Sequence, residues 1–423
     1  MLLPFLALAL ALSSVPALVA GAATPTSEGW ETRYTATKPE EVARAAATAK
    51  TTSPTSKVKG KAFDRFVTIW FENQNFEKCA GDANFGWIAQ QGITLTNLFA
   101  VTHPSQPNYM ASIAGDYFGM NHDRFLRSPR NISTVLDLLD TKKISWAHYQ
   151  EDMPYSGFEG KHYVNQDYGA NDYVRKHNPA IMHDSVTYSE QRLSQIKNLS
   201  MTDSSRSMFH RDLHNDKLPQ WMFITPNMTS DGHDTSVTTA GQWCRRFVEP
   251  LLNDPYFMRN TMMLITWDEN ETYARRNNIM GILLGDAVPA ELVGTQDAHF
   301  YNHYSSIATV SANWDLPTLG RWDVGANVFA WVANMTGDQV RSWPSENELE
   351  DMYWNHSYGG PFHRRVNHQG VPAPNLKLDK SSSGRRILKS VRETWKDSNA
   401  PSYYEDSLEV PDGRKPPEGF APR

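Results

Sequence analysis

Cysteine is scarce in this chain of 423 residues, which contains only Cys79 and Cys244. Two cysteines exclude a disulfide-rich scaffold, and the absence of any Cys-x-x-Cys sequence argues against a thiolate zinc site. The two residues could form one disulfide in an exported protein, which we predict here, or they could remain two buried free thiols.

Long hydrophobic runs and blocks of one charge are also missing. The only extended apolar run, residues 2–12, is too short to span a bilayer comfortably, and no second run follows. The net charge of −6 includes no long basic block. We therefore predict no stable membrane anchor and no nucleic-acid partner.

The first 22 residues have the pattern of a secretory signal peptide. The apolar run is followed by Ala20-Gly21-Ala22, a small-x-small cleavage pattern. We predict a secreted protein of the extracellular space or cell wall. Six Asn-x-Ser/Thr sequons agree with export. Four of them are predicted to carry glycans: Asn131, Asn198, Asn334 and Asn355. Asn227 and Asn270 adjoin candidate site residues and are expected to be unmodified.

Composition divides the rest of the chain into three parts. Residues 23–60 are rich in Thr, Ala, Ser and Lys and are predicted to be a flexible arm. Residues 61–360 are predicted to form one folded domain. Residues 361–423 are rich in Pro, Ser and charge and are predicted to be a tail that wraps the surface or stays partly disordered.

The folded part alternates short apolar runs with helical patterns. The predicted strands lie at 66–71, 144–149, 221–225, 262–267 and 281–284, and the helical patterns at 132–139, 241–252 and 304–314. This alternation predicts an α/β fold with a mostly parallel central sheet and helices on both faces.

Ser105 lies between two prolines, where an apolar run gives way to a helical pattern. Pro107 suits the first turn of a helix. A hydroxyl at such a turn lies beside free backbone N–H groups and the positive helix end, which together form an anion site. Asn108 could add a side-chain donor. The alternative is an ordinary helix start without chemistry.

Polar residues follow several of the predicted strands, where ligands gather in open parallel sheets. Any one of them could be a helix cap or a solvated loop residue. Together they supply the carboxylate, amide and imidazole groups that hold Mg²⁺, Mn²⁺, Fe or Zn²⁺. These residues are Glu72, Asn73, Asp231, His233, Asp234, Asp268, Glu269 and, before the last helical pattern, His303.

Six short motifs occur in a matching order over residues 65–315. They are Glu72-Asn73-Gln-Asn-Phe76, His103-Pro-Ser-Gln-Pro-Asn-Tyr109, Lys176-His-Asn-Pro179, Pro226-Asn-Met-x-x-Asp-Gly-His-Asp234, Thr266-Trp-Asp-Glu-Asn270 and Asn302-His-Tyr-Ser305. With them the chain resembles fungal-type secreted acid phosphatases of the phosphoesterase family. That family belongs to the alkaline phosphatase superfamily and includes bacterial acid phosphatases and phosphocholine-releasing phospholipases C.

The resemblance implies hydrolysis of small phosphate monoesters through a phosphoserine on Ser105, for phosphate scavenging outside the cell. It implies His233 and His303 as general acid or base. It also implies one divalent or trivalent metal ion held by Glu72, Asn73, Ser105, Asp268 and Glu269. The residues implied to contact the substrate or support the nucleophile loop are Asn108, His103, Lys176, His177 and Asp231, with Asp234 as a substitute for Asp231.

Two other functions remain open: a phospholipase C-type phosphodiesterase with the same core, and a secreted glycoprotein that binds without turnover. The absence of Arg-His-Gly excludes phosphohistidine acid phosphatases, and the absence of Cys-x-Pro-x-Arg argues against a sulfatase. Asp123 mimics part of a dinuclear metallophosphatase signature whose halves lie too close together here, so we leave it out of the site. The sequence leaves the oligomeric state open.

Overall fold

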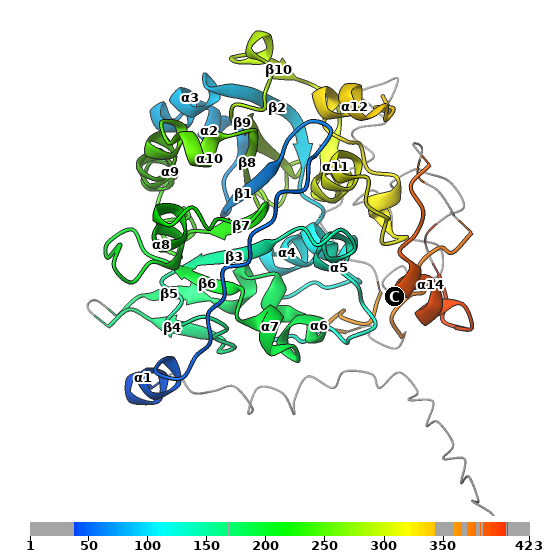
Figure 1. The fold of residues 1–423 in the computed structure, drawn as a ribbon, viewed down its shortest axis with the longest axis horizontal. Helices are drawn as coiled ribbons and strands as arrows, with labels where there is room; N and C mark the ends of the chain where they lie inside the picture. Colours follow the sequence, from blue (N-terminus) through cyan, green and yellow to red (C-terminus); the bar gives the residue numbers. More distant parts are fainter. Residues whose placement is uncertain are drawn as a thin grey trace, which may run out of the picture.

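A nine-stranded sheet forms the centre of the computed structural model (Figure 1). Its order is β10-β2-β9-β8-β1-β7-β3-β6, with β11 also paired to β2. Neighbouring strands are parallel except at β9, which runs antiparallel to both β2 and β8. The predicted α/β fold with a mostly parallel sheet is confirmed. The strands are β1 (Arg65–Phe71), β2 (Gly92–Phe99), β3 (Trp146–Glu151), β6 (Ile196–Leu199), β7 (Trp221–Thr225), β8 (Thr261–Trp267), β9 (Asn278–Leu284), β10 (Gln296–Asp297) and β11 (Tyr301–Asn302).

The structure describes residues 38–166, 169–342, 359–365, 370–377, 381, 384–402 and 404. The predicted signal peptide and Asn355 lie outside these residues. Within them, no helix is both long enough and apolar enough to cross a membrane.

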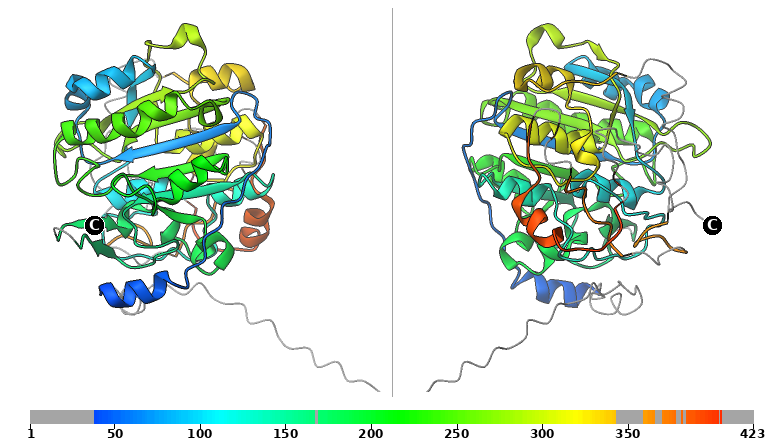
Figure 2. Two further views of the ribbon diagram at one scale, coloured as in Figure 1. Left: turned by 60° about the vertical axis from the view of Figure 1, so that its left-hand side comes forward. Right: turned by 90° about the vertical axis from the view of Figure 1, so that its right-hand side faces the viewer.

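Helices cover both faces of the sheet. Figures 1 and 2 show α9 and α11 on opposite sides of the strands, with α3 packed on α9 and α4 packed on α11. The middle strands read as nearly continuous apolar runs because both of their faces are covered. A two-stranded sheet of β4 (His162–Val164) and β5 (Asn171–Val174) lies apart. The α-helices are α1 (Pro39–Ala46), α2 (Phe76–Gly81), α3 (Ala83–Ala89), α4 (Ser105–Ala114), α5 (Val135–Asp140), α6 (Asp184–Thr187), α7 (Glu190–Leu193), α8 (Met208–His214), α9 (Val237–Leu252), α10 (Pro255–Met258), α11 (Tyr304–Trp314), α12 (Ala330–Thr336) and α14 (Lys389–Trp395).

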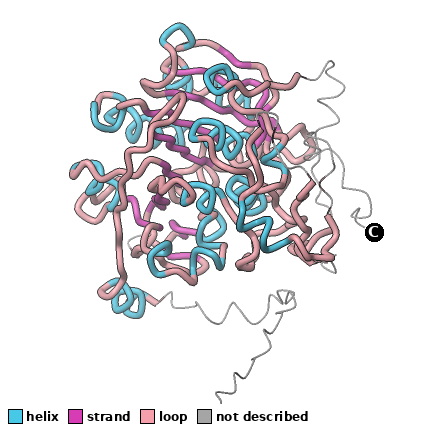
Figure 3. The backbone as a smooth tube through the Cα atoms, turned by 45° about the vertical axis from the view of Figure 1, so that its right-hand side comes forward, coloured by secondary structure: helices cyan, strands magenta, loops and turns pink. Residues whose placement is uncertain are grey.

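The segment between α1 and β1 runs along the outside of the domain as an extended chain (Figure 3). Ser53 Oγ donates to Asp212 Oδ1 at 2.6 Å, and Ser56 Oγ donates to Gln220 Oε1 at 2.5 Å. The backbone N–H of Val58 also donates to Gln220 Oε1, at 2.8 Å. The serine-rich composition of this segment predicted flexibility. In the structure, two of its serine hydroxyls donate hydrogen bonds to buried acceptors. These hydrogen bonds hold this part of the predicted arm against the domain, and the flexibility of the arm stays a prediction.

Part of the predicted C-terminal tail packs on the domain near the end of α4. The hydroxyl of Tyr404 is buried and donates to Asp116 Oδ2 at 2.5 Å, and Arg321 donates to the same hydroxyl. The backbone N–H of Phe362 donates to the carbonyl of Phe118 at 3.2 Å. Aromatic residues of the predicted tail therefore pack in the core of the folded domain, and the boundary at residue 360 stays a prediction.

Both cysteines are free and buried. Cys79 lies on α2 and Cys244 on α9, where each packs in the hydrophobic core. Burial raises the pKa of both thiols, so both remain protonated. The structure therefore has two buried free thiols where a disulfide was predicted, and the disulfide itself stays a prediction.

The described sequons differ in accessibility. Asn334 is exposed, whereas Asn131 and Asn198 are half-buried. Asn227 and Asn270 are only 5% and 2% exposed, which agrees with the expectation that they are unmodified. Asn334 offers the best acceptor, and glycosylation itself stays a prediction.

Candidate active site

The ends of two adjacent parallel strands form the floor of the site. Phe71 pairs with Trp267 in register, so the residues that follow, Glu72 and Asp268, share one edge of the sheet. Asp268 Oδ1 accepts hydrogen bonds from the backbone N–H groups of Asn73 (3.1 Å) and its neighbour Glu269 (2.7 Å). The predicted convergence of strand-end residues is therefore present.

Ser105 is the first residue of α4, and its side chain points toward this edge. Its Oγ lies 3.0 Å from Glu72 Oε2 and 3.3 Å from Glu269 Oε1. The residue is 1% exposed, so its hydroxyl sits in a low-dielectric environment beside two carboxylates. The helix start predicted around this serine is confirmed.

Asn108 holds the backbone that leads to the nucleophile. Its amide oxygen accepts from the N–H groups of Val101 (3.0 Å) and Thr102 (3.2 Å). Its amide nitrogen donates to the carbonyls of Thr102 (2.9 Å) and Pro104 (3.2 Å). The whole amide is thus engaged in shaping the loop, and a role of Asn108 as a donor to the substrate stays a prediction.

Four buried carboxylates crowd the strand ends: Glu72, Asp231, Asp268 and Glu269. Removal from water raises the pKa of all four, and repulsion from Asp268 raises the pKa of the other three further. The positive charge of Lys176 opposes this shift for Glu72, Asp231 and Glu269. One lysine is little compensation for four carboxylates, so a bound cation would stabilise the ionised cluster.

Two overlapping sets of residues could hold that cation. The first is the predicted set, in which Asn73 Oδ1 and Asp268 Oδ2 are buried without a hydrogen-bond partner among the described residues. The second is Glu72, His177 and Asp231, whose ligand atoms lie within 4.8 Å of one another. Oxygen-rich donors with one imidazole fit a hard or borderline metal ion, and Glu72 belongs to both sets.

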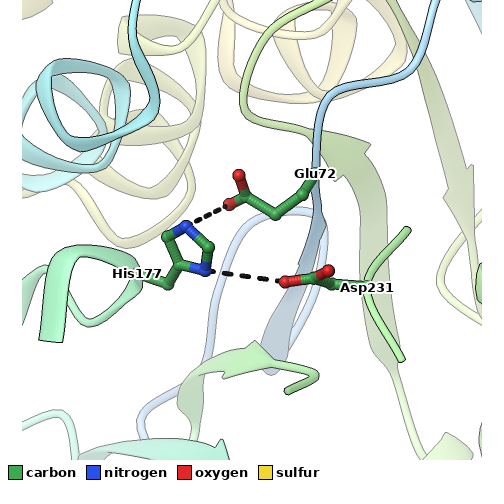
Figure 4. A group of neighbouring side chains, drawn as sticks. All are labelled: Glu72, His177 and Asp231. Carbon is green, nitrogen blue, oxygen red and sulfur yellow. Dashed lines mark ion pairs between the residues drawn. The ribbon is translucent and has the colours of Figure 1, made fainter. Parts of the chain in front are cut away.

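His177 lies between two carboxylates (Figure 4). Its Nε2 is 3.2 Å from Glu72 Oε1, and its Nδ1 is 3.5 Å from Asp231 Oδ2. The ring stacks on Tyr109 at 5.1 Å. Burial, with a smaller effect of Lys176, holds the pKa of His177 well below its usual value. The imidazole is therefore neutral and suited to be a metal ligand. The sequence had indicated a contact of His177 with the substrate and not with a metal ion.

His303 is held against the end of β8. Its Nε2 donates to the backbone carbonyl of Asp268 at 2.6 Å, and its ring packs on Trp70 with centroids 4.4 Å apart. Burial lowers the pKa of His303 to about 3. In this structure the ring therefore braces the Asp268 strand end, and the acid or base role implied for His303 stays a prediction.

Of the two histidines predicted to act as general acid or base, His233 is the more accessible to solvent. Its side chain is 27% exposed, and its Nδ1 lies 2.7 Å from Asp234 Oδ1. Its backbone N–H donates to Asp231 Oδ1 at 2.8 Å, and its ring lies 6.1 Å from that of His177. A partly exposed imidazole paired with a carboxylate is suited to proton transfer.

His103 lies between Glu269 and Tyr273, next to the nucleophile loop. Its Nδ1 is hydrogen-bonded to the Glu269 carboxylate, and its ring is stacked under Tyr273 at 3.9 Å. Burial lowers the pKa of His103 to about 3, so the ring is neutral.

Lys176 forms an ion pair with Asp123 next to the start of α4. Its Nζ lies 3.2 Å from Asp123 Oδ2, while Asp123 Oδ1 accepts the backbone N–H of Gln106 at 3.0 Å. Burial alone would lower the pKa of Lys176, but the carboxylates of Asp123 and Glu72 outweigh it and raise the pKa. Lys176 therefore keeps a positive charge beside the start of α4.

Sequence reasoning missed three residues of the site. Tyr109 donates a hydrogen bond to Glu72, and its spacing of four residues from Ser105 on one helix was the signal available. Asp123 was set aside, and Tyr273 was not singled out. Both lie on loops, where no periodic pattern indicates what a side chain contacts.

A model of the phosphoesterase family matches residues 55–317. The chain belongs to the phosphoesterase family. Two of its most similar relatives are the acid phosphatase of Aspergillus fumigatus, 50% identical over 85% of this chain and 78% of the relative, and the phosphate-repressible acid phosphatase of Penicillium chrysogenum, 47% identical over 91% and 88%. The resemblance inferred from the six motifs is confirmed.

Among solved structures, the chain is similar to a protein of the alkaline phosphatase superfamily from Vibrio parahaemolyticus. The TM-score is 0.38, with 10% identity over 64% of this chain and 73% of that one.

Proposed function

We propose that this phosphoesterase is a metal-dependent acid phosphatase that hydrolyses phosphate monoesters through a phosphoserine on Ser105. The observation that carries the proposal is the position of Ser105 Oγ, which lies 3.0 Å from Glu72 and 3.3 Å from Glu269 at a helix N-terminus. Four fungal relatives, 46–50% identical, are named acid phosphatase or probable acid phosphatase, which supports it.

In the first step, Ser105 Oγ attacks phosphorus and its proton passes to the Glu72 carboxylate that accepts its hydrogen bond. The bond from phosphorus to the alcohol oxygen breaks, and that oxygen takes a proton from His233. In the second step, water attacks the phosphoserine, with His233 accepting its proton. The bond from phosphorus to Ser105 Oγ breaks, Glu72 returns its proton to that oxygen, and inorganic phosphate leaves with both residues restored.

The substrate phosphoryl group is bound by positive charge and by backbone donors. We assign Lys176 and the N–H groups at the start of α4 to its oxygens, since both lie beside Ser105. Asp123 now accepts the N–H of Gln106, so it is the group that a phosphoryl oxygen displaces.

The metal ligands in this proposal are Glu72, Asn73, Ser105, Asp268 and Glu269. A cation bound there supplies charge that lowers the pKa of the serine hydroxyl and stabilises the phosphoryl oxygens. His177 and Asp231 hold Glu72 from its other side.

We further propose that the enzyme works outside the cell and recovers phosphate for uptake. The signal-like residues 1–22 and the sequons support export. The Penicillium chrysogenum relative is named phosphate-repressible, which supports a role in phosphate supply.

The test is an assay of the purified protein for phosphate release from a monoester and from phosphatidylcholine between pH 3 and 9, together with metal analysis. We expect turnover of the monoester, greatest at acidic pH, and a stoichiometric metal. Turnover of phosphatidylcholine in preference to the monoester would establish a phosphodiesterase, and the absence of any turnover would favour a binding protein.

A further inference from the structure

An exposed aromatic ring lies at the edge of the site. Tyr273 is 47% exposed and stacks one face on His103, with centroids 3.9 Å apart and planes 22° apart. His103 precedes Ser105 by two residues and is bonded to Glu269, which itself lies 3.3 Å from the nucleophile. Tyr273 therefore lies beside the reacting centre, and about half of the surface of this residue is open to solvent.

Hydrogen bonds hold the loop that carries this ring. The backbone N–H of Thr272 donates to Asn75 Oδ1 at 3.1 Å, and Asn75 Nδ2 donates back to Thr272 Oγ1 at 2.8 Å. At the base of the loop, the N–H of Asn270 donates to Asn277 Oδ1 at 2.9 Å. The ring is thus presented by an anchored loop, as a binding wall must be.

The ring stays neutral while it faces an anionic substrate. Burial raises the pKa of the Tyr273 phenol, and the carboxylates of Glu269 and Asp123 raise it further. No phenolate forms to repel phosphate, and the exposed surface is that of an uncharged aromatic ring.

We propose that the exposed face of Tyr273 stacks on the alcohol portion of the substrate, so that the enzyme favours phosphate monoesters whose alcohol carries a planar aromatic ring. Aromatic rings gain from offset stacking beyond the area they bury. A small aliphatic alcohol gains no such contact. This inference rests on the proposed monoester hydrolysis and names its preferred substrate class.

The test uses phenylphosphonate and methylphosphonate as inhibitors, because their P–C bonds are not cleaved and leaving-group chemistry does not enter. In Tyr273→Ala we expect the inhibition constant for phenylphosphonate to rise about 3- to 10-fold, and that for methylphosphonate to change by less than about 2-fold. Tyr273→Phe, which keeps the ring, should behave as the wild type.

Tyr188→Ala is a matched control, since Tyr188 is 49% exposed and lies over Arg127 and Arg130 rather than His103. It should leave both inhibition constants unchanged. Equal increases for both inhibitors in Tyr273→Ala would mean that the ring only braces His103, and no change for either would mean that it contacts neither. Both results overturn the inference while leaving monoester hydrolysis in place. A wild-type protein that hydrolyses no monoester would instead overturn the proposed function and this inference with it.

Discussion

The phenol of Tyr109 donates a hydrogen bond to Oε1 of Glu72, while Oε2 of the same carboxylate accepts one from Ser105. Both donors lie on α4, four residues apart and on the same face. One helix therefore supplies the nucleophile and also orients the carboxylate that faces it.

Tyr109→Phe keeps the ring stacked on His177 but removes the donor to Glu72. We expect kcat/KM to fall about 10- to 100-fold, because a hydrogen bond to a buried charged group is worth roughly 1.5–3 kcal/mol. The control is Tyr173→Phe, which loses a buried hydroxyl bonded to Asn178 instead. Steady-state kinetics that show equal losses in the two variants would contradict a specific role for Tyr109.

Ser105→Ala should lower turnover by about 10³-fold or more, because the proposed nucleophile is lost. It should also prevent labelling of the protein by a ³²P-monoester quenched in acid. Ser112→Ala is the matched control, since Ser112 lies on the same helix and donates only to the Tyr109 carbonyl. A labelled protein in Ser105→Ala would place the nucleophile elsewhere.

Metal analysis of three variants separates the two candidate ligand sets. We expect Asp268→Asn to lose both metal and activity, because neutralising a carboxylate weakens the attraction for a hard cation. Glu72→Gln should do the same, since Glu72 belongs to both sets. His177→Asn should retain stoichiometric metal. If His177→Asn lost the metal and Asp268→Asn kept it, the ion would belong with Glu72, His177 and Asp231.

The sequence predicted those site residues whose positions are set directly by the ends of strands. Glu72 and Asp268 each follow an apolar run directly, and parallel register then brings them together. The start of α4 at Ser105 could also be predicted, since Pro107 and the following helical pattern indicate where the helix begins.

The contacts that the sequence did not indicate are those that depend on tertiary packing. His303 and His233 both occur in motifs, yet only burial against Trp70 separates a bracing histidine from an accessible one. Asp123 was dismissed by its spacing to other acidic residues, whereas its partner is the N–H of Gln106, seventeen positions earlier. Likewise, the composition of residues 51–60 did not indicate the acceptors that bind their hydroxyls.

Stability should fall in acid because of a buried histidine. His148 on β3 has no hydrogen-bond partner among the described residues, and burial, with a smaller contribution from His183, lowers its pKa to about 3. Because the pKa of His148 is lower in the folded state than in the unfolded chain, this residue contributes to stability in a pH-dependent way. Its contribution is complete above the unfolded-state pKa of ~6.5 and is lost as pH falls toward 3. The loss is up to ~1.4 kcal/mol per pH unit.

His148→Phe removes this titration and preserves the stack on Phe223. We expect its melting temperature to decline less than that of the wild type between pH 6.5 and pH 4. Parallel declines in the two proteins would assign the acid loss to other groups, such as the similarly buried His183.

Glu151 should act in the opposite direction. Burial, with repulsion from Asp152, raises the pKa of Glu151 to about 7. Its contribution to stability is therefore complete below the unfolded-state pKa of ~4.3 and is lost as pH rises through 7. Glu151→Gln should flatten the decline of the melting temperature between pH 5 and pH 8. A steeper decline in the variant would contradict this sign.

The free thiols give a chemical test of the core. Cys79 and Cys244 should resist an alkylating reagent in the native protein, because both are buried and their pKa values are raised. After denaturation without reductant, both should be alkylated. A linked peptide in the mass spectrum would show that they had oxidised to a disulfide.

Asp123 gives the enzyme an acidic group that already occupies a donor at the start of α4. In the proposed function, inorganic phosphate must share that donor with a carboxylate tethered to the same chain. When the product dissociates, the Asp123 carboxyl group can again accept this hydrogen bond, so the donor regains a partner. The competing carboxylate weakens the binding of inorganic phosphate at this donor, so the product leaves more readily than it would from a donor without a partner.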